Sequence, residues 1–403
     1  MRGRFLRLSS LALVLTGLLA GVQRAEAQSD KRVHELAELL APEVERAVGL
    51  PFKLPPRVAV RSRSAVREYM TRKLDDDLPP QELVGLAAAY RLFGLIPDTL
   101  DLRALLLALY TEQVVGYYDP DSSTLYVVAG SDLGQLRILL AHELVHALQG
   151  QYMPLDSLLD PAAANDRRMA AQAVLEGQAT LAALTALKLD RDFEAIPDFW
   201  STYRRALKQQ HELMPVFSAA PTIIRETLIF PYLGGADFVR WFDRYHGDTV
   251  PFGPRLPLST EQVLHPDRYS RGDLPISLVL TEPDDAVYSD GLGEFETRVL
   301  LTVLTGSESM GRAGALAWGG DRYGVYQAGD GQYALVWWTL WDTERAAERF
   351  ATLLSREWPK RGMPSRRFRV KRMSVDGHPG VQLIDAPKDW PRWNDLPNVA
   401  IDN

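Results

Sequence analysis

The stretch Leu136-Arg-Ile-Leu-Leu-Ala-His-Glu-Leu-Val-His-Ala-Leu-Gln149 contains no Gly or Pro and predicts a helix. His142 and His146 are four residues apart, so they lie on one face of that helix and both imidazoles can reach a single metal ion. Glu143 is turned about 100° from His142, so it can flank the ion as a general base for water without being a ligand. Leu144 and its apolar neighbours fall on the opposite side, where the helix can pack into a core.

A site of this kind needs a third ligand, because hydrolytic zinc sites use three protein ligands and leave one position for water. No histidine closely follows His146, so the candidate is Glu176, in an alanine-rich stretch from Arg168 to Lys188 that predicts a second helix. Its small residues, Gly177 included, would allow the close approach to the first helix that metal bonds of about 2 Å require. The sequence therefore predicts a Zn²⁺ site at His142, His146 and Glu176. The alternative for Glu176 is a solvated carboxylate on a helix face.

These residues resemble the gluzincin class of zinc metallopeptidases, which carry HExxH on one helix and a glutamate ligand on a following helix. The resemblance covers Leu136 to about Lys188 and implies the same roles for the four residues named above. Many gluzincins place an aspartate four residues after the ligand glutamate, where it orients a ligand histidine, whereas this chain has Thr180. The resemblance therefore leaves the partner of the histidines unassigned.

Three further segments resemble secreted bacterial proteins that are predicted peptidases. They are Gly116-Tyr-Tyr-Asp-Pro120, Phe230-Pro-Tyr-Leu-Gly-Gly235 and Ser259-Thr-Glu-Gln-Val-Leu-His-Pro266. A peptidase of this kind gains from a donor that stabilises the oxyanion, usually a His, Tyr or Arg beyond the third ligand. Tyr232 and His265 are therefore the candidate donors. For each, the alternative is a structural role in a loop or in the core.

The N-terminus predicts a signal peptide over residues 1–27. Three arginines precede a short apolar run, and Ala25-Glu-Ala27 fits a cleavage site. The prediction is a secreted or periplasmic protein with no stable membrane span after cleavage, and the alternative is an uncleaved N-terminal anchor. The chain has no cysteine, which excludes disulfides and thiolate zinc ligands. Its formal net charge of −7 argues against nucleic acid as a partner.

The pattern of elements predicts an α+β fold in two parts. Residues 28–274 would form a mainly helical, zincin-like catalytic domain with a small edge-stranded sheet, and residues 275–403 a smaller α+β domain of unknown role. The segment Val114 to Val128 predicts a hairpin. Its strand ahead of the zinc helix is expected to form a sheet edge on which a peptide could add a strand, and the alternative is a meander that never meets substrate. Pro231 predicts a kink or a junction between two helices.

The function predicted from these features is that of a secreted zinc-dependent peptidase, an endopeptidase, with protein or peptide substrates. A second hypothesis is a non-catalytic zinc-binding envelope scaffold or assembly factor. Glu143 argues against it, because a structural site needs no base. A third hypothesis, an aminopeptidase, would need acidic residues that anchor the substrate amino terminus, and the sequence shows no recognisable motif for them. The sequence sets no oligomeric state.

Overall fold

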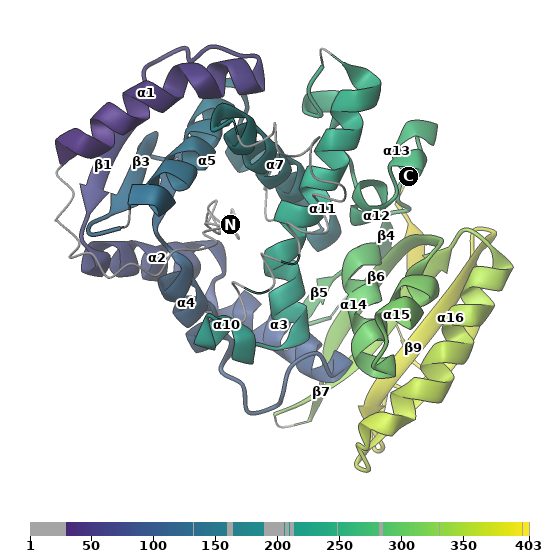
Figure 1. Ribbon diagram of the computed structural model, residues 1–403. Helices are drawn as coiled ribbons and strands as arrows, with labels where there is room; N and C mark the ends of the chain where they lie inside the picture. The colour runs from purple at the N-terminus through teal and green to yellow at the C-terminus, as the bar shows by residue number, and fades with distance from the viewer. Residues whose placement is uncertain are drawn as a thin grey trace.

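The structure is a computed structural model that describes residues 30–131, 133–158, 164–188, 205, 209, 213–247, 249–281, 285–329, 331–396 and 398–402. A helical part with a small sheet, purple to teal in Figure 1, lies beside a part built on a larger sheet, green to yellow. This confirms the predicted α+β class. The predicted signal peptide, residues 1–27, lies outside the described residues, as does most of a helix expected around residues 199–213.

The small sheet has the order β1-β3-β2. β2 (Gly116–Asp119) and β3 (Thr124–Val128) form the predicted hairpin, and β1 (Arg57–Arg61) pairs with β3 in parallel. The expectation of an edge strand directly ahead of the zinc helix is wrong, because that strand, β3, is paired on both sides. The N-terminal segment returns as β1 and covers the edge that the hairpin alone would have left open. The outer strands among the described residues of this sheet are β1 and β2.

Helices surround this sheet and continue towards the second part of the chain. They are α1 (Asp30–Val48), α2 (Arg63–Asp77), α3 (Pro80–Phe93), α4 (Leu102–Gln113), α5 (Leu133–Tyr152), α6 (Leu155–Leu158), α7 (Asn165–Ala186), α10 (Pro215–Ala219), α11 (Thr222–His246), η1 (Gly253–Arg255), α12 (Thr260–Leu264) and α13 (Pro266–Arg271). Side-chain caps mark two of the starts, since Ser62 Oγ and Asp101 Oδ1 accept hydrogen bonds from backbone amides of α2 and α4. Among the described residues, no helix combines the length and the apolar character that a membrane crossing requires.

α11 runs unbroken through Pro231, so the predicted helix junction is wrong. A proline inside a helix costs about 3 kcal/mol through its missing amide hydrogen and its ring clash. The residues around it are buried, and Phe230 stacks on Phe295 of the second part with ring centroids 4.1 Å apart. The apolar residues around Pro231 are buried against the helical part and against the second part. This burial outweighs the free-energy cost of the proline.

α7 crosses α11 at two glycines. A Cβ on Gly177 would lie 2.6 Å from the amide nitrogen of Ala236, and one on Gly235 would lie 2.6 Å from the carbonyl carbon of Ala173. Both positions therefore exclude any side chain. The sequence analysis expected Gly177 to serve the approach to the HExxH helix, and the structure corrects this. Gly177 faces α11, whereas Ala179 and other alanines further along α7 pack with α5.

The second part is an antiparallel sheet with the order β5-β6-β7-β9-β8. Its elements are β4 (Leu278–Leu280), β5 (Tyr288–Asp290), α14 (Gly293–Thr305), α15 (Glu308–Ala315), β6 (Trp318–Gly329), β7 (Gln332–Trp341), α16 (Glu344–Glu357), η2 (Trp358–Arg361), β8 (Arg366–Val375), β9 (His378–Pro387) and β10 (Val399–Ile401). The helices α14, α15 and α16 cover one face (Figure 1). Trp337 and Trp341 point into that layer, and Trp338 into a second core with Trp390 and Trp393 on the other face. All three central tryptophans are buried, as predicted.

One continuous hydrophobic core joins residues of both parts. The predicted boundary between residues 274 and 275 stays a prediction.

Buried carboxylates line the seam between the two parts. Asp321 accepts hydrogen bonds from the amides of Leu292 and Gly293 and from two indole N–H groups. Asp166, at the start of α7, accepts from the amide and the hydroxyl of Thr260. Glu296 Oε1 accepts from the Tyr90 hydroxyl at 2.9 Å. The partners of Asp166 and Glu296 were not predicted from the sequence, because each pair joins segments that are far apart in the chain.

Burial raises the carboxyl pKa values of this seam. It raises the pKa of Asp166 to about 7 and that of Glu296 to about 8. Burial, with the nearby Glu294 carboxylate adding to it, raises the pKa of Glu261 to about 9. A buried carboxylic acid keeps its proton more readily than the same group in the unfolded chain, so folding stabilises the protonated forms.

The first prediction concerns the helix crossing. Gly235→Ala should lower the free energy of unfolding by about 1–3 kcal/mol, the usual cost of overpacking, because the new methyl group meets backbone atoms of α7. Denaturant unfolding measures the effect. Arg244→Ala, at an exposed position near the end of the same helix, is the control. Equal losses in both variants would contradict the proposed contact.

The second prediction concerns pH. Carboxyl groups whose pKa values are raised by folding contribute to the free energy of unfolding. This contribution is fully present below about pH 4 and is lost as the pH rises through about 7–9. The melting temperature should therefore fall from pH 5 to pH 9, and Glu296→Gln should make this fall shallower because the amide needs no proton. Glu348→Gln, at an exposed position of α16, is the control. A slope that Glu296→Gln leaves unchanged would show that the seam does not titrate.

Candidate metal centre

α5 and α7 bring His142, His146 and Glu176 together. His142 Nε2 lies 3.1 Å and His146 Nε2 3.4 Å from Glu176 Oε2, and the two Nε2 atoms are 3.0 Å apart. The three side chains are buried, and one ligand atom from each lies within 4.8 Å of the others. The i, i+4 spacing on α5 and the packing of α7 against it produce this convergence. The group could hold a metal ion.

The donor set fits a small divalent cation. Tetrahedral coordination with bonds of about 2.1 Å sets ligand atoms about 3.4 Å apart, close to the distances found here. Two imidazole nitrogens and one carboxylate oxygen also make up the ligand set of an open zinc site. All three atoms offer lone pairs to one point, so a positive charge is required between them.

Without an ion, that charge is a proton. Burial by itself lowers the pKa of His146, but the Glu176 carboxylate outweighs burial and raises it. Burial raises the pKa of Glu176, but the two histidines lower it by more. The pKa of Glu176 therefore lies below its ordinary value. Burial lowers the pKa of His142. His146 is therefore the protonated member of the triad, and a metal ion replaces that proton on binding.

Glu143 lies within the same helix turn and is fully buried. Its charge contributes to the raised pKa of His146, so its carboxylate lies within electrostatic reach of the triad. A carboxylate beside a three-ligand metal group is suited to accept a proton from water.

Gln149 supplies the partner of His146 that the sequence analysis left unassigned. His146 Nδ1 lies 2.7 Å from Gln149 Oε1, an acceptor, so this ring nitrogen donates, and Nε2 offers its lone pair to an ion that replaces its proton. Gln149 Nε2 donates to the Leu175 carbonyl oxygen at 3.1 Å and to Gln178 Oε1 at 2.9 Å. The amide thus ties α5 to α7 beside Glu176. Its three-residue spacing from His146 on the same helix was the signal in the sequence.

The two candidate oxyanion donors lie in different places. The Tyr232 ring stacks on the His142 ring with centroids 6.0 Å apart, so α11 brings this phenol to the triad. His265 Nε2 lies 2.8 Å from Glu294 Oε1, at the junction of α12 and α13. α12 meets α7 through Asp166, and Glu176 is ten residues, or roughly 15 Å, further along that helix. The structure therefore places His265 in the carboxylate seam and does not bring it to the triad.

Comparison with known proteins gives few matches. The model of a family described as a domain of unknown function (DUF8575) matches residues 280–379, which lie in the second part and outside the triad. No curated protein matches the chain. A solved structure, "Crystal structure of a putative hydrolase with a novel fold from Chloroflexus aurantiacus", is similar at 16% identity and a TM-score of 0.36, over 62% of this chain and 93% of that chain.

The third prediction concerns Gln149. Gln149→Ala should weaken Zn²⁺ binding by about 10–100-fold, because His146 loses the acceptor that fixes its ring and tautomer. Competition with a chelating dye measures the affinity. Gln151→Ala is the control, since Gln151 is also on α5 but bonds to the loop at Lys53 and Leu54. Equal affinities in the two variants would remove Gln149 from the site.

Proposed function

We propose that this protein is a zinc-dependent peptidase. The observation that carries the proposal is the buried group of His142, His146 and Glu176, with the Glu143 carboxylate beside it. The gluzincin resemblance of the sequence supports peptide bonds as the substrate. Residues 1–27, which predict a signal peptide, support a secreted or periplasmic location.

In this proposal the protein groups move one proton along a defined route. The zinc ion supplies Lewis-acid activation of water and of the scissile carbonyl. Glu143 accepts a proton from the water molecule as the water oxygen attacks the carbonyl carbon. The C–N bond then breaks, and Glu143 passes the same proton to the leaving amine.

Two neighbours assist these steps. Tyr232, stacked on His142, donates its hydroxyl proton in a hydrogen bond to the oxygen that gains negative charge. Gln149 holds His146 in the tautomer that faces the triad.

The second candidate is a closed structural zinc site, as in a scaffold or assembly factor. The observation that favours it is burial, since the triad and Glu143 have exposed fractions of 7% or less. Structural zinc sites are closed, whereas catalytic sites keep a position open to substrate. The buried Glu143 carboxylate opposes this candidate, because desolvating an additional charge has no benefit for a structural ion.

The fourth prediction separates the two candidates. The wild-type protein should hold about one zinc ion per chain, and His146→Ala and Glu176→Ala should lose it. Glu143→Gln should keep the zinc ion but slow peptide hydrolysis by about 10²–10⁴-fold, the usual contribution of a general base. Elemental analysis and a quenched fluorescent peptide library give the two measurements.

The control is Glu68→Gln, the same change at an exposed glutamate of α2, which should alter neither. Cleavage by Glu143→Gln at the wild-type rate would show that Glu143 is not the base, and no cleavage by the zinc-loaded wild type would leave the structural site as the function.

A further inference from the structure

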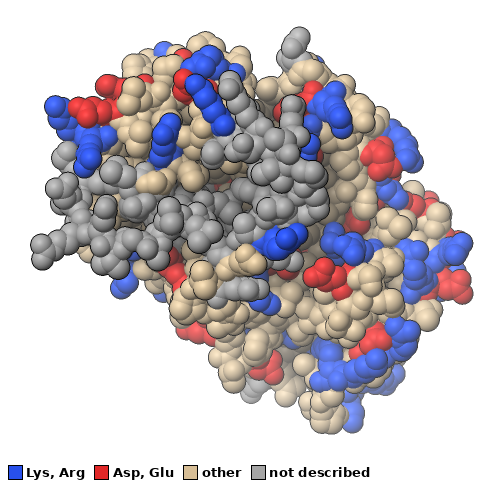
Figure 2. Space-filling view, viewed as in Figure 1, with Lys and Arg blue, Asp and Glu red and all other residues tan. Residues whose placement is uncertain are grey.

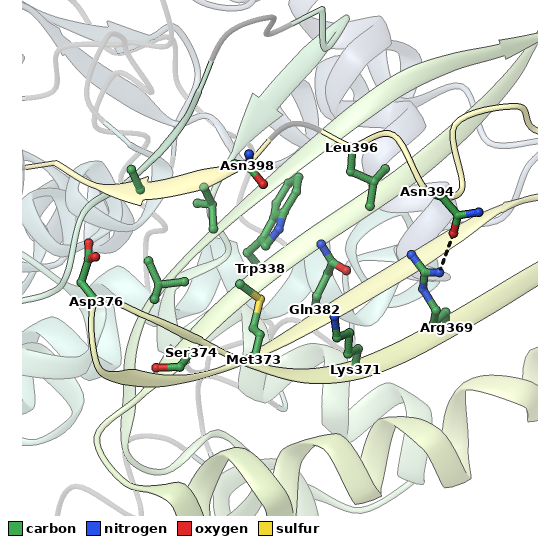
Figure 3. Close-up of a pocket in the computed structure, with 13 residues that line it drawn as sticks. Trp338, Arg369, Lys371, Met373, Ser374, Asp376, Gln382, Asn394, Leu396 and Asn398 are labelled. Carbon is green, nitrogen blue, oxygen red and sulfur yellow. Dashed lines mark hydrogen bonds between the residues drawn. The ribbon is translucent and has the colours of Figure 1, made fainter.

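The face of the large sheet that α14–α16 leave uncovered carries an open groove of about 540 Å³. Successive side chains along a strand point to opposite faces of a sheet, and residues paired directly across neighbouring strands point to the same face. Trp337 of β7 points to the helices, so Trp338 points to the opposite face, in register with Gln382 of β9, which is in turn in register with Lys371 of β8. These three residues form a row across the floor of the groove (Figure 3).

The two walls of the groove present residues at intervals of two. β8 contributes Arg369, Lys371 and Met373, and the segment before β10 contributes Asn394, Leu396 and Asn398. In an extended peptide every second side chain points the same way. The side chains of such a peptide would therefore meet the groove residues at matching intervals. The amide groups of Gln382, Asn394 and Asn398 can each donate and accept, as the backbone of an extended chain requires.

The charge in the groove is concentrated at one end. Figure 3 shows Arg369 at one end and Asp376 at the other, with Lys371 and Gln382 between them. Arg369 is held in place, since it donates to the Trp393 carbonyl oxygen at 2.7 Å and to Asn394 Oδ1 at 3.4 Å. Its Nε is buried and has no hydrogen-bond partner among the described residues. Lys371 is exposed.

The sequence around β8 is rich in cations. From Arg356 to Arg372 the chain carries eight Lys or Arg residues and one acidic residue, Glu357, although its net charge is −7. Some of these cations lie on or near α16, the region over which Figure 2 shows Lys and Arg gathered. Several are neutralised, Arg366 by Asp385 and Arg372 by Glu344. The cations that line the groove, Arg369 and Lys371, form no salt bridge among the described residues and are available to an anionic ligand.

We infer that this groove binds an acidic peptide segment in an extended conformation, with its carboxylates at Arg369 and Lys371. The groove lies on the second part of the chain, away from the triad, and the inference stands whether or not the triad is hydrolytic. An acidic stretch of a protein partner would bind along β8, and its basic or amino-terminal side would lie towards Asp376.

The test uses the full chain and a fluorescent decapeptide of alternating Glu and Ser. Binding is measured by anisotropy in the Glu143→Gln background, so that the probe stays intact even if the triad cleaves peptides. With its groove residues unchanged, the protein should bind this probe at least tenfold more tightly than it binds the same peptide with every Glu replaced by Gln. Lys371→Glu should weaken binding at least tenfold, and added salt should weaken it in the starting protein.

Lys388→Glu is the matched control, since Lys388 is an exposed lysine of the same part that does not line the groove, and it should change the affinity less than twofold. Thermal melting checks that both variants fold. Equal affinities in the two variants, or no difference between the Glu and Gln peptides, would overturn the inference. Free succinate that displaces the probe at the peptide's own concentration would also overturn it, because the groove would then recognise a small carboxylate and not a peptide.

Discussion

The absence of side chains at Gly177 and Gly235 determines how closely α7 and α11 approach, and the position of Tyr232 beside the candidate metal centre depends on that distance. Glu176 precedes one of these glycines, and Tyr232 lies one turn before the other. On its other face α7 packs alanines against α5, which carries both histidines. A single helix with small residues on two faces therefore fixes the ligand from α7, the histidines from α5 and the tyrosine from α11 relative to one another.

This arrangement explains which parts of the site were visible in the sequence. The histidine spacing is a property of one helix, and Glu176 stood out as the carboxylate of an alanine-rich segment, so local periodicity was sufficient for both. The helices over residues 136–149 and 168–188 and the hairpin over residues 114–128 were predicted for the same reason. The partner of Gly177 was wrong, because small residues indicate a close approach without indicating which element approaches. Of the two alternatives for Pro231, the helix junction was wrong for a related reason, since a local cost was outweighed by burial against distant segments.

The residues that sequence reasoning missed are those whose role comes from contacts across the chain. Gln149 follows His146 by three residues on one helix, but only the geometry shows its amide between His146 and α7. The carboxylates of the seam were invisible for the same reason. Asp166 and Thr260 are 94 residues apart in the sequence, and Tyr90 and Glu296 are 206 residues apart. Isolated acidic residues are ordinarily solvated, and no local pattern distinguishes those that fold into a core.

Asp166 and Glu176 sit on the same helix, and this has a thermodynamic consequence. Over ten residues a packed helix is stiff, so a change in how the seam holds Asp166 alters the position at which Glu176 meets the histidines. Coupling free energies are reciprocal. If closure of the seam favours the ligand geometry of Glu176, an ion bound at the triad favours closure of the seam by the same free energy. Metal binding at the triad and the docking of the C-terminal sheet onto the helical part are then thermodynamically coupled, so that each favours the other.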